Sequence, residues 1–266
     1  MDKVKLSIIT ICLNAEKTID KTIESVLHQS VPVYEYIVID GNSSDSTYDI
    51  ICAYDQKFAE KGISYTHISE KDKGISDAFN KGIQKASGNL IGIINADDEL
   101  IRDANEILQK RSIEVDADIF YGNCIWEDEK RNVSYISKPK HDFRKLLYNM
   151  ILIHPSTFVK KSAYQDCGLF DISYKLCMDK ELLYRMYLAG KQFEYIDKSL
   201  TKVRSGGVSD NHARAVFREE SRMEIEAGEP RLKVKIVQIK KILRRRLVDI
   251  IKDTKLYQKN KKPLNK

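Results

Sequence analysis

Two adjacent carboxylates follow a short apolar run in the segment 88–100, which reads Gly-Asn-Leu-Ile-Gly-Ile-Ile-Asn-Ala-Asp-Asp-Glu-Leu. The aliphatic residues between 90 and 94 predict a strand that is covered on both faces and ends at Asn95. Asp97 and Asp98 then stand beyond the carboxyl end of a strand, where open α/β sheets bind ligands. Adjacent carboxylates repel each other, and a Mg²⁺ ion held together with substrate phosphates would relieve that repulsion.

The same two carboxylates also suit the start of a helix. Acidic residues are favoured in a first helical turn, and a helix is expected to begin near Arg102. The segment alone does not choose between a metal–phosphate site and a helix start, so the elements around it must decide.

The first 100 residues alternate between strand and helix patterns. β-Branched runs predict strands over residues 5–13, 36–39, 63–68 and 90–94, and apolar residues at helical spacing predict helices over 15–29, 47–61 and 74–86. This order predicts an α/β fold with a parallel sheet and right-handed crossovers.

Polar loops follow each of these strands. They begin at Asn14, at Asp40 (Asp-Gly-Asn-Ser-Ser-Asp-Ser-Thr), at Ser69 and at Asn95. A parallel sheet brings such loops to one edge. The sequence contains neither a GxGxxG nor a GxxxxGK[ST] motif, so a nucleotide at this edge would be held by side chains and a metal.

The four loop segments resemble, in order, those of the family 2 glycosyltransferases of the GT-A fold. They read ITICLNAEKTIDKTIESVLHQ, VIDGNSSDST, SEKDKGISDAFNKGI and IGIINADD, and the resemblance spans about the first 215 residues. It implies a Rossmann-like, mostly parallel sheet flanked by helices. It also implies transfer of a sugar, with inversion, from a nucleoside diphosphate donor, most often a UDP-sugar, with Mg²⁺ or Mn²⁺ as the cofactor.

The resemblance assigns expected roles to residues that contact the donor. Thr10 and Asn14 fall in the first nucleotide-contacting loop, and Asp40 matches the carboxylate that reads the base, although a plain turn residue is the alternative there. Asp72 and Lys73 lie in the loop beside the nucleotide.

In the last of the four motifs, the resemblance assigns a different role to each of the two carboxylates. Asp97 is expected to face the ribose or phosphate, and Asp98 is expected to ligate the divalent metal. A metal that bridges diphosphate oxygens stabilises the charge that develops on the leaving group.

The second half of the chain has less regular patterns. It predicts strands over 116–126, 133–136, 151–159 and 193–196, and helices over 142–150, 160–167 and from 177 onward. Asp179, at the start of the last helix, matches the catalytic base of the family, which must take a proton from the acceptor hydroxyl. Glu181 is the alternative base, and an N-cap role is the structural alternative for Asp179.

Three further features are more ambiguous. Asn80 is expected to cap or pack, and His154 to be a core histidine, although a His-Pro dipeptide occurs near the donor sugar in many members of this family. The segment 205–212 contains Ser-Gly-Gly and suits either a loop that closes over the diphosphate or an ordinary surface loop.

The amino-acid composition and the N-terminal segment indicate the cellular compartment of the protein. The 266 residues contain five cysteines without a CxxC pair, which favours a reducing compartment over a disulfide framework or a zinc site. The N-terminal apolar run is too short for a spanning helix or a signal peptide. We therefore expect a cytoplasmic protein.

The C-terminal 38 residues are strongly basic, with 14 Lys or Arg against 3 Asp or Glu. Within residues 231–252, Leu232, Ile236, Ile239, Leu243, Leu247 and Ile250 recur at helical spacing. A basic amphipathic helix suggests an anionic membrane surface, and packing on the catalytic domain or a dimer interface are the alternatives. Nucleic acid is not expected, because no recognition motif is present.

These patterns divide the chain into a GT-A domain over residues 1–228 and a helical tail over 229–266. Residues 1–100 form the nucleotide-binding half of the domain, and 101–228 form the acceptor half. The predicted protein is a metal-dependent inverting glycosyltransferase of surface polysaccharide synthesis, peripheral at the inner face of the plasma membrane, acting on a saccharide or lipid-linked acceptor. The alternatives are a non-catalytic, membrane-associated nucleotide-sugar binding module and a sugar nucleotidyltransferase, which would need a glycine-rich basic loop near residue 11.

Overall fold

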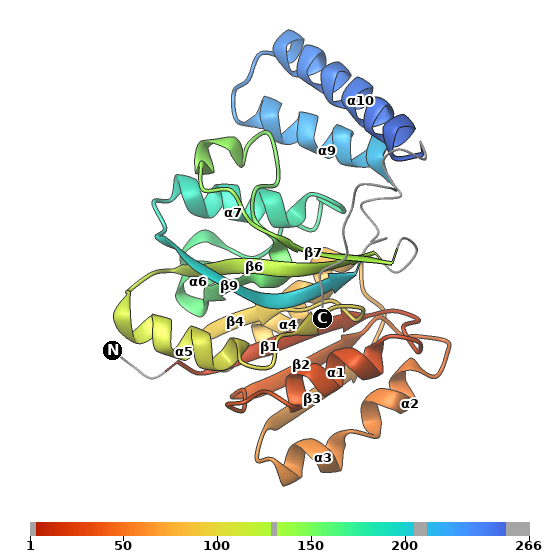
Figure 1. Ribbon diagram of the computed structural model, residues 1–266, viewed down its shortest axis with the longest axis vertical. Coiled ribbons are helices and arrows are strands. Elements are labelled where there is room, and N and C mark those ends of the chain that lie inside the picture. The colour runs from red at the N-terminus through yellow and green to blue at the C-terminus, as the bar shows by residue number, and fades with distance from the viewer. Residues whose placement is uncertain (1–3, 129–131, 205–211, 254–266) are drawn as a thin grey trace.

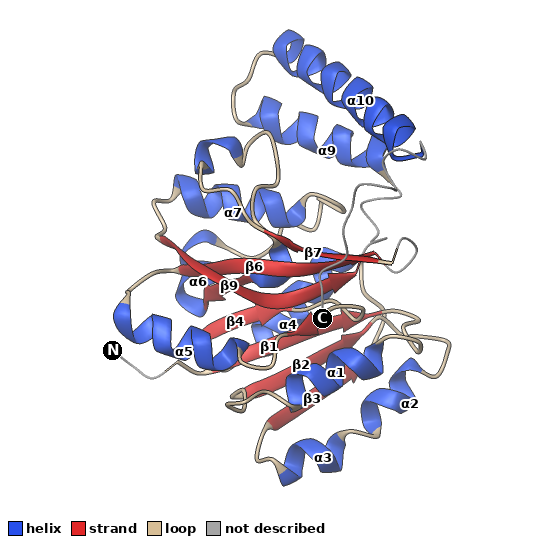
Figure 2. Ribbon diagram, in the orientation of Figure 1, coloured by secondary structure: helices blue, strands red, loops and turns tan. Residues whose placement is uncertain are grey.

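The computed structural model describes residues 4–128, 132–204 and 212–253, and its centre is a nine-stranded mixed sheet (Figures 1 and 2). The strand order is β3-β2-β1-β4-β8-β6-β9-β5, with β7 paired to β6. The strands are β1 (Leu6–Cys12), β2 (Glu35–Asp40), β3 (Ser64–Ser69), β4 (Leu90–Ile93), β5 (Glu99–Leu100), β6 (Ile119–Asp128), β7 (Val133–Ser137), β8 (Thr157–Lys160) and β9 (Phe193–Arg204).

The first four strands are parallel and confirm the predicted βαβ pattern. The strand β8 lies antiparallel between β4 and β6, whereas β6 and β9 are parallel to each other. The carboxyl ends of β1 to β4 therefore meet at one edge, with the carboxyl ends of β6 and β9 on the same side of the molecule (Figure 1).

Helices cover both faces of the sheet because side chains alternate along each strand. On β1, Ile8 packs into one core with α1 (Ile19–Leu27), α2 (Thr47–Cys52), α3 (Asp55–Glu60) and α5 (Ala104–Glu114). Its neighbour Ile9 packs into the other core with α4 (Ile75–Lys85), α6 (Lys161–Cys167) and α7 (Met178–Leu188).

Two helices complete the described chain, α9 (Ala213–Glu226) and α10 (Arg231–Asp253). They form a hairpin on the α7 side of the molecule, at the end opposite β3 and α3 (Figure 1). Met223 of α9 is buried in the same core as α7. The expected helix over 231–252 is thus confirmed.

Four sequence predictions were wrong in detail. The strand predicted over 193–196 continues to Arg204 as β9. The helix predicted over 47–61 is two helices, interrupted at Tyr54, whose hydroxyl turns inward to bond Asp20 and Glu24 of α1. The strand predicted over 151–159 begins only at Thr157, because Pro155 lies in a 3₁₀ turn (His154–Ser156) before it.

The helix predicted over 142–150 is a single 3₁₀ turn, Phe143–Lys145, followed by turns. Here Phe143 packs against Phe193 and Tyr187, so the segment follows an aromatic cluster and does not continue as a helix. Tertiary packing overrides local propensity at this place.

Candidate active site

The loops that follow β1 and β2 are tied together by short hydrogen bonds. Asn14 adopts a left-handed backbone conformation (φ 52°), which brings its side-chain oxygen within 2.9 Å of the Ser44 backbone nitrogen, from which it accepts a hydrogen bond. Its own N–H donates to the Ser43 hydroxyl at 2.8 Å. The structure therefore places Asn14 in an exposed loop at the carboxyl edge, as the sequence predicts.

Asp40, the last residue of β2, is fully buried. Its carboxylate accepts hydrogen bonds from the Ser43 backbone N–H at 3.0 Å and from the hydroxyls of Ser43 and Ser69. The carboxylate thus fastens the loop after β2 to the end of β3. A contact between Asp40 and the nucleotide base stays a prediction.

Asp72 joins this group from the loop after β3. Its Oδ1 accepts the Gly74 N–H at 2.8 Å, and its Oδ2 lies so near Gly41 that a Cβ there would sit 2.8 Å away. A glycine at position 41 is therefore what lets the two loops approach. The neighbouring Lys73 is exposed.

Thr10 does not lie in a loop. It is an interior residue of β1, fully buried, and its hydroxyl accepts a hydrogen bond from the Tyr36 hydroxyl at 3.0 Å. Thr10 thus lies inside the strand predicted over 5–13 and not in the loop after it, so its assignment to the first nucleotide-contacting loop was wrong.

The two carboxylates of the opening motif lie in a tight turn between β4 and β5. The Asp98 N–H donates to the Asn95 carbonyl at 3.1 Å, and β5 follows directly. Because α5 begins only at Ala104, the alternative of a helix start is wrong for this motif. The turn projects from the same edge as the loops of Asn14, Asp40 and Asp72.

Asp98 is buried in this turn, with 2 % of its surface exposed. Its oxygens accept hydrogen bonds from Asn95 Nδ2 at 3.0 Å and from the Arg204 backbone N–H at 3.2 Å. Burial and the neighbouring Asp97 carboxylate raise the pKa of Asp98 to about 7, although both hydrogen bonds and the Arg204 charge oppose the shift. Burial also raises the pKa of the half-buried Asp97.

This donor set fits a hard divalent cation. The turn presents two carboxylates whose pKa values are raised, chiefly by burial, and a bound cation would lower them. No group of three or more His, Cys, Asp or Glu side chains within the described ranges is placed to hold a metal. Mg²⁺ commonly takes one or two carboxylates and completes its shell with water and substrate phosphate. Asp98 is the residue that would hold the ion, with the Asp97 carboxylate beside it.

Arg204 and Glu219 contribute to the site but were not predicted from the sequence. Arg204 ends β9, and its backbone and charge both act on the acidic turn. A basic residue at a strand end before Ser-Gly-Gly is a signal that could have indicated it. For Glu219, which lies on α9, no local signal exists.

Asp179 lies in the first turn of α7, where Cys177 is the N-cap residue. The structural alternative for Asp179, an N-cap, is therefore wrong. Its Oδ1 accepts the N–H of the adjacent Lys180 at 2.7 Å. Acidic residues are favoured in the first turn of a helix, and a carboxylate is a group that can act as a general base.

The alternative base, Glu181, is held by Arg185. Its two carboxylate oxygens accept from Arg185 Nε at 2.9 Å and Nη2 at 2.8 Å, and the same guanidinium also donates to the Leu169 carbonyl at 2.9 Å. A bidentate pair of this kind leaves Glu181 committed to structure. Asp179 as the base stays a prediction.

The segment before α7 is joined to the donor-side loops. Lys175 Nζ donates to the Lys73 carbonyl at 2.8 Å, and the Ser76 hydroxyl donates to the Tyr174 carbonyl at 2.7 Å. These bonds place the start of α7 beside the loop of Asp72. They connect the predicted base segment to the predicted donor site across about 100 residues of sequence.

Glu219 of α9 fixes the same segment from the other side. Its carboxylate accepts three backbone N–H groups, those of Lys175 at 2.8 Å and of Leu176 and Cys177 at 2.9 Å. Next to it, Glu220 forms a buried ion pair with Lys180 at 3.0 Å. The carboxylates of α9 thus hold the turn that presents Asp179.

His154 lies in the 3₁₀ turn before β8, packed against Phe79 and Phe170. Burial lowers its pKa, while the Asp179 charge acts in the opposite direction. His154 is thus a half-buried residue between two aromatic rings, and its assignment as a core histidine stays a prediction. Asn80 packs as well, since its side-chain amide bonds both backbone groups of Phe170 at 2.8 and 2.9 Å.

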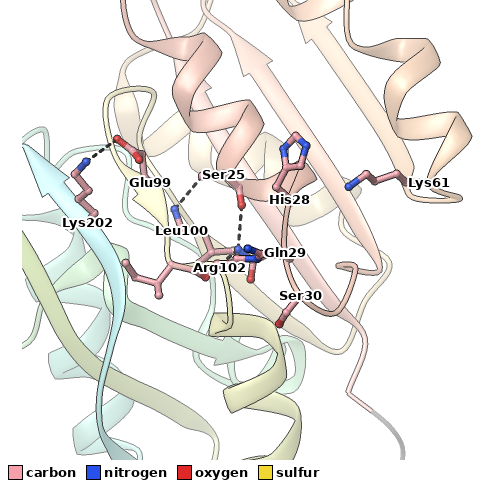
Figure 3. Close-up of a pocket in the computed structure, with 10 residues that line it drawn as sticks. Ser25, His28, Gln29, Ser30, Lys61, Glu99, Leu100, Arg102 and Lys202 are labelled. Atoms are coloured by element: carbon pink, nitrogen blue, oxygen red, sulfur yellow. Dashed lines mark hydrogen bonds and ion pairs between the residues drawn. The ribbon is translucent and has the colours of Figure 1, made fainter.

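A separate cavity of about 540 Å³ lies between the end of α1 and β5 (Figure 3). Its walls are joined by hydrogen bonds from the Leu100 N–H to the Ser25 hydroxyl and from Gln29 Nε2 to the Ile101 carbonyl, both at 2.9 Å. None of the predicted site residues lines it. The candidate active site is therefore the loop edge.

The model of the family described as "Glycosyl transferase family 2" matches residues 7–171. "Glycosyltransferase GlyA" of Streptococcus pneumoniae is 25% identical over 223 residues, which cover 77% of this chain and 31% of that protein. The "GalNAc(5)-diNAcBac-PP-undecaprenol beta-1,3-glucosyltransferase" of Campylobacter jejuni is 34% identical over 125 residues, 47% of this chain and 40% of that protein. The matched segments thus cover less than half the length of these two relatives.

Two solved structures share the fold. The S. aureus TarS 1-349 complex with UDP-GlcNAc has a TM-score of 0.66 at 17% identity, covering 88% of this chain and 70% of that one. The mannosyltransferase PcManGT from Pyrobaculum calidifontis, in complex with GDP-Man and Mn²⁺, has a TM-score of 0.64 at 15% identity, covering 90% and 70%. These matches confirm the predicted GT-A fold.

Proposed function

Because this chain belongs to glycosyl transferase family 2, we propose that it is an inverting glycosyltransferase that takes a sugar from a nucleoside diphosphate donor. The observation that carries the proposal is the Asp97–Asp98 turn, whose carboxylates have raised pKa values at the edge where the donor-side loops meet. We propose a uridine donor, since the TarS structures contain UDP and UDP-GlcNAc.

The proposed roles follow from the geometry of this edge. The loops of Asn14, Asp40 and Asp72, with Lys73, would hold the nucleotide, and Asp97 would contact the donor. With Asp98 as its main ligand, bound Mg²⁺ or Mn²⁺ would supply charge neutralisation to the departing diphosphate. This role matches the chemistry of the turn, because the ion would stabilise the ionised form of Asp98.

The base proposed for the reaction is Asp179. Its carboxylate would take the proton of the acceptor hydroxyl while the hydroxyl oxygen bonds the anomeric carbon and the bond from that carbon to the diphosphate breaks. The attack comes from the face opposite the diphosphate, so the anomeric configuration inverts. The bonds of Lys175 to the Lys73 carbonyl and of Leu176 to Glu219, just before α7, support this assignment because they join the start of α7 to the loop of Asp72 and to α9.

The acceptor that we propose is a lipid-linked saccharide of a surface polysaccharide. The names of the relatives support this class, since they include an undecaprenol-linked glucosyltransferase and a "Putative teichuronic acid biosynthesis glycosyltransferase" of Bacillus subtilis. The reaction would then take place at the cytoplasmic face of the membrane. No helix in the described part of the chain is long and apolar enough to cross a bilayer.

The test combines donor binding and transfer. Thermal-shift screening of nucleoside diphosphate sugars with Mn²⁺ identifies the donor, and transfer from it to lipid-linked acceptors is then followed by mass spectrometry. The variant Asp179→Asn is expected to bind the donor normally and to lose at least about 100-fold in turnover, whereas Glu181→Gln loses far less.

Two results would contradict the proposal. Near-wild-type turnover of Asp179→Asn would show that Asp179 is not the base. Donor binding without transfer or hydrolysis, on every acceptor tried, would instead support a nucleotide-sugar binding module.

A further inference from the structure

The hairpin of α9 and α10 buries one face of α10 through mostly polar contacts. Val234 and Gln238 are 2 % and 6 % exposed, and Gln238 Nε2 donates to Glu224 of α9 at 3.1 Å. Lys241, on the same face, forms ion pairs with Glu220 at 2.9 Å and Glu224 at 3.4 Å. The helix is thus held in place by its polar side.

The opposite face of α10 is aliphatic and open. Leu232, Ile236, Ile239 and Leu243 are between 46 % and 72 % exposed. At 3.6 residues per turn they form one stripe on the side of the helix away from Val234, Gln238 and Lys241. An amphipathic helix packed on its own protein normally buries its apolar stripe, so this orientation needs another explanation.

Basic side chains flank the stripe on both sides. Lys240 and Arg244 lie along one flank and Lys235 along the other, and all three are exposed. In the part of the chain that the structure describes, they form no ion pair with a carboxylate. This arrangement, an apolar stripe between two basic flanks, is complementary to a surface with an apolar interior and anionic groups above it.

We infer that α10 lies flat on an anionic lipid surface. Its four aliphatic side chains enter the boundary between headgroups and acyl chains, and Lys235, Lys240 and Arg244 contact lipid phosphates. A second copy of this chain is a poorer partner, because pairing two stripes would bring their basic flanks together.

This docking would also orient the candidate site. The helix α9 holds the start of α7 through Glu219, and α10 is fixed to α9 through Lys241. A lipid surface beneath α10 would therefore keep a constant position relative to Asp179, as a lipid-linked acceptor requires. That last consequence rests on the proposed function, whereas the docking itself does not.

The experiment is vesicle co-sedimentation of the full chain, without donor or acceptor. The wild type is expected to bind phosphatidylcholine–phosphatidylglycerol vesicles and to bind phosphatidylcholine alone at least about tenfold more weakly. The double variant Ile236→Ser/Leu243→Ser should lose at least about tenfold in binding to the mixed vesicles. The matched control Ile113→Ser, at an aliphatic side chain 71 % exposed on α5, should bind as the wild type does.

Equal binding of the double variant and the wild type would overturn the inference, as would equal binding to neutral vesicles. A wild-type dimer in light scattering that dissociates in the double variant, without vesicle binding by either protein, would assign the stripe to a second copy. Asp179→Asn should bind vesicles normally. Vesicle binding therefore tests the docking, and sugar transfer tests the proposed catalysis, independently of each other.

Discussion

The two halves of the molecule build their parts of the candidate site in different ways. In the first half, consecutive βα loops fasten one another, as when Asp40 bonds Ser43 three residues later and Ser69 on the adjacent strand. In the second half, the turn that presents Asp179 is held by Glu219, about 40 residues later on α9. The sheet thus positions the proposed donor side, and helix packing positions the segment of the proposed base.

This difference explains where sequence motifs are informative. Parallel strands place their loops at one edge whatever the details, so a short motif after each strand predicts a shared site. No such rule links α7 to α9. Changes in the first half should therefore affect donor and metal binding, and changes on α9 should affect turnover alone.

The largest effect is expected from Asp98→Asn, on the donor side of the comparison. Turnover should fall at least about 100-fold, because the main proposed ligand of the metal is lost. The variant should nevertheless be more stable than the wild type by about 2–4 kcal/mol at pH 8, since it removes a buried charge.

The sign of this stability effect depends on pH. Between the ordinary carboxyl pKa and about 7, folded Asp98 keeps its proton while the unfolded chain loses it, so wild-type stability falls as pH rises. Denaturant unfolding should show no gain for Asp98→Asn near pH 4 and the full gain above pH 7. The exposed Asp103→Asn is the control, and an equal gain at every pH would contradict the explanation.

The second largest effect is expected from Glu219→Ala, which changes the contact between α9 and the segment before α7. Removing the acceptor of three N–H groups should loosen the start of α7 and lower kcat about tenfold, with donor KM unchanged. Glu219→Gln keeps one acceptor oxygen and should lose less. Arg218→Ala, at an exposed position on the same helix, should be neutral. A rise in donor KM without a fall in kcat would show that α9 supports the donor loops instead.

A smaller effect is expected from metal binding by the wild type at different pH values. At pH 6 an ion at Asp98 must displace a proton, whereas at pH 8 the carboxylate is already ionised. The affinity for Mn²⁺ in the presence of donor should therefore rise up to about tenfold per pH unit below 7 and level off above it. Calorimetric titration measures this, and an affinity independent of pH would place the ion elsewhere.

The smallest effect is expected from Thr10→Val, within the sheet itself. Loss of the buried bond with Tyr36 should cost about 1 kcal/mol of unfolding free energy. Donor KM should not change, because Thr10 is interior to β1. A large increase in donor KM, measured by initial rates, would instead indicate that Thr10 contacts the nucleotide.

The sequence by itself determined the parallel half of the sheet and the position of its polar loops. Strands 36–39 and 90–94 are apolar throughout; Asp40 directly follows the first, and Asp97–Asp98 follow the second after Asn95 and Ala96. The edge that collects Asp40, Asp72 and Asp97–Asp98 therefore follows from period and order alone. The family resemblance added the roles expected of these residues.

Only the tertiary structure decided which carboxylates are engaged and which face of α10 is covered. Arg185 forms its ion pair with Glu181 and not with Asp179. The helix α9 packs against the polar side of α10, where it contacts Lys241 and Gln238. These outcomes depend on contacts between residues far apart in the chain. The spacing of apolar residues predicts that a helix has an apolar face and a polar face. Which of the two faces is buried depends on the element that packs against the helix.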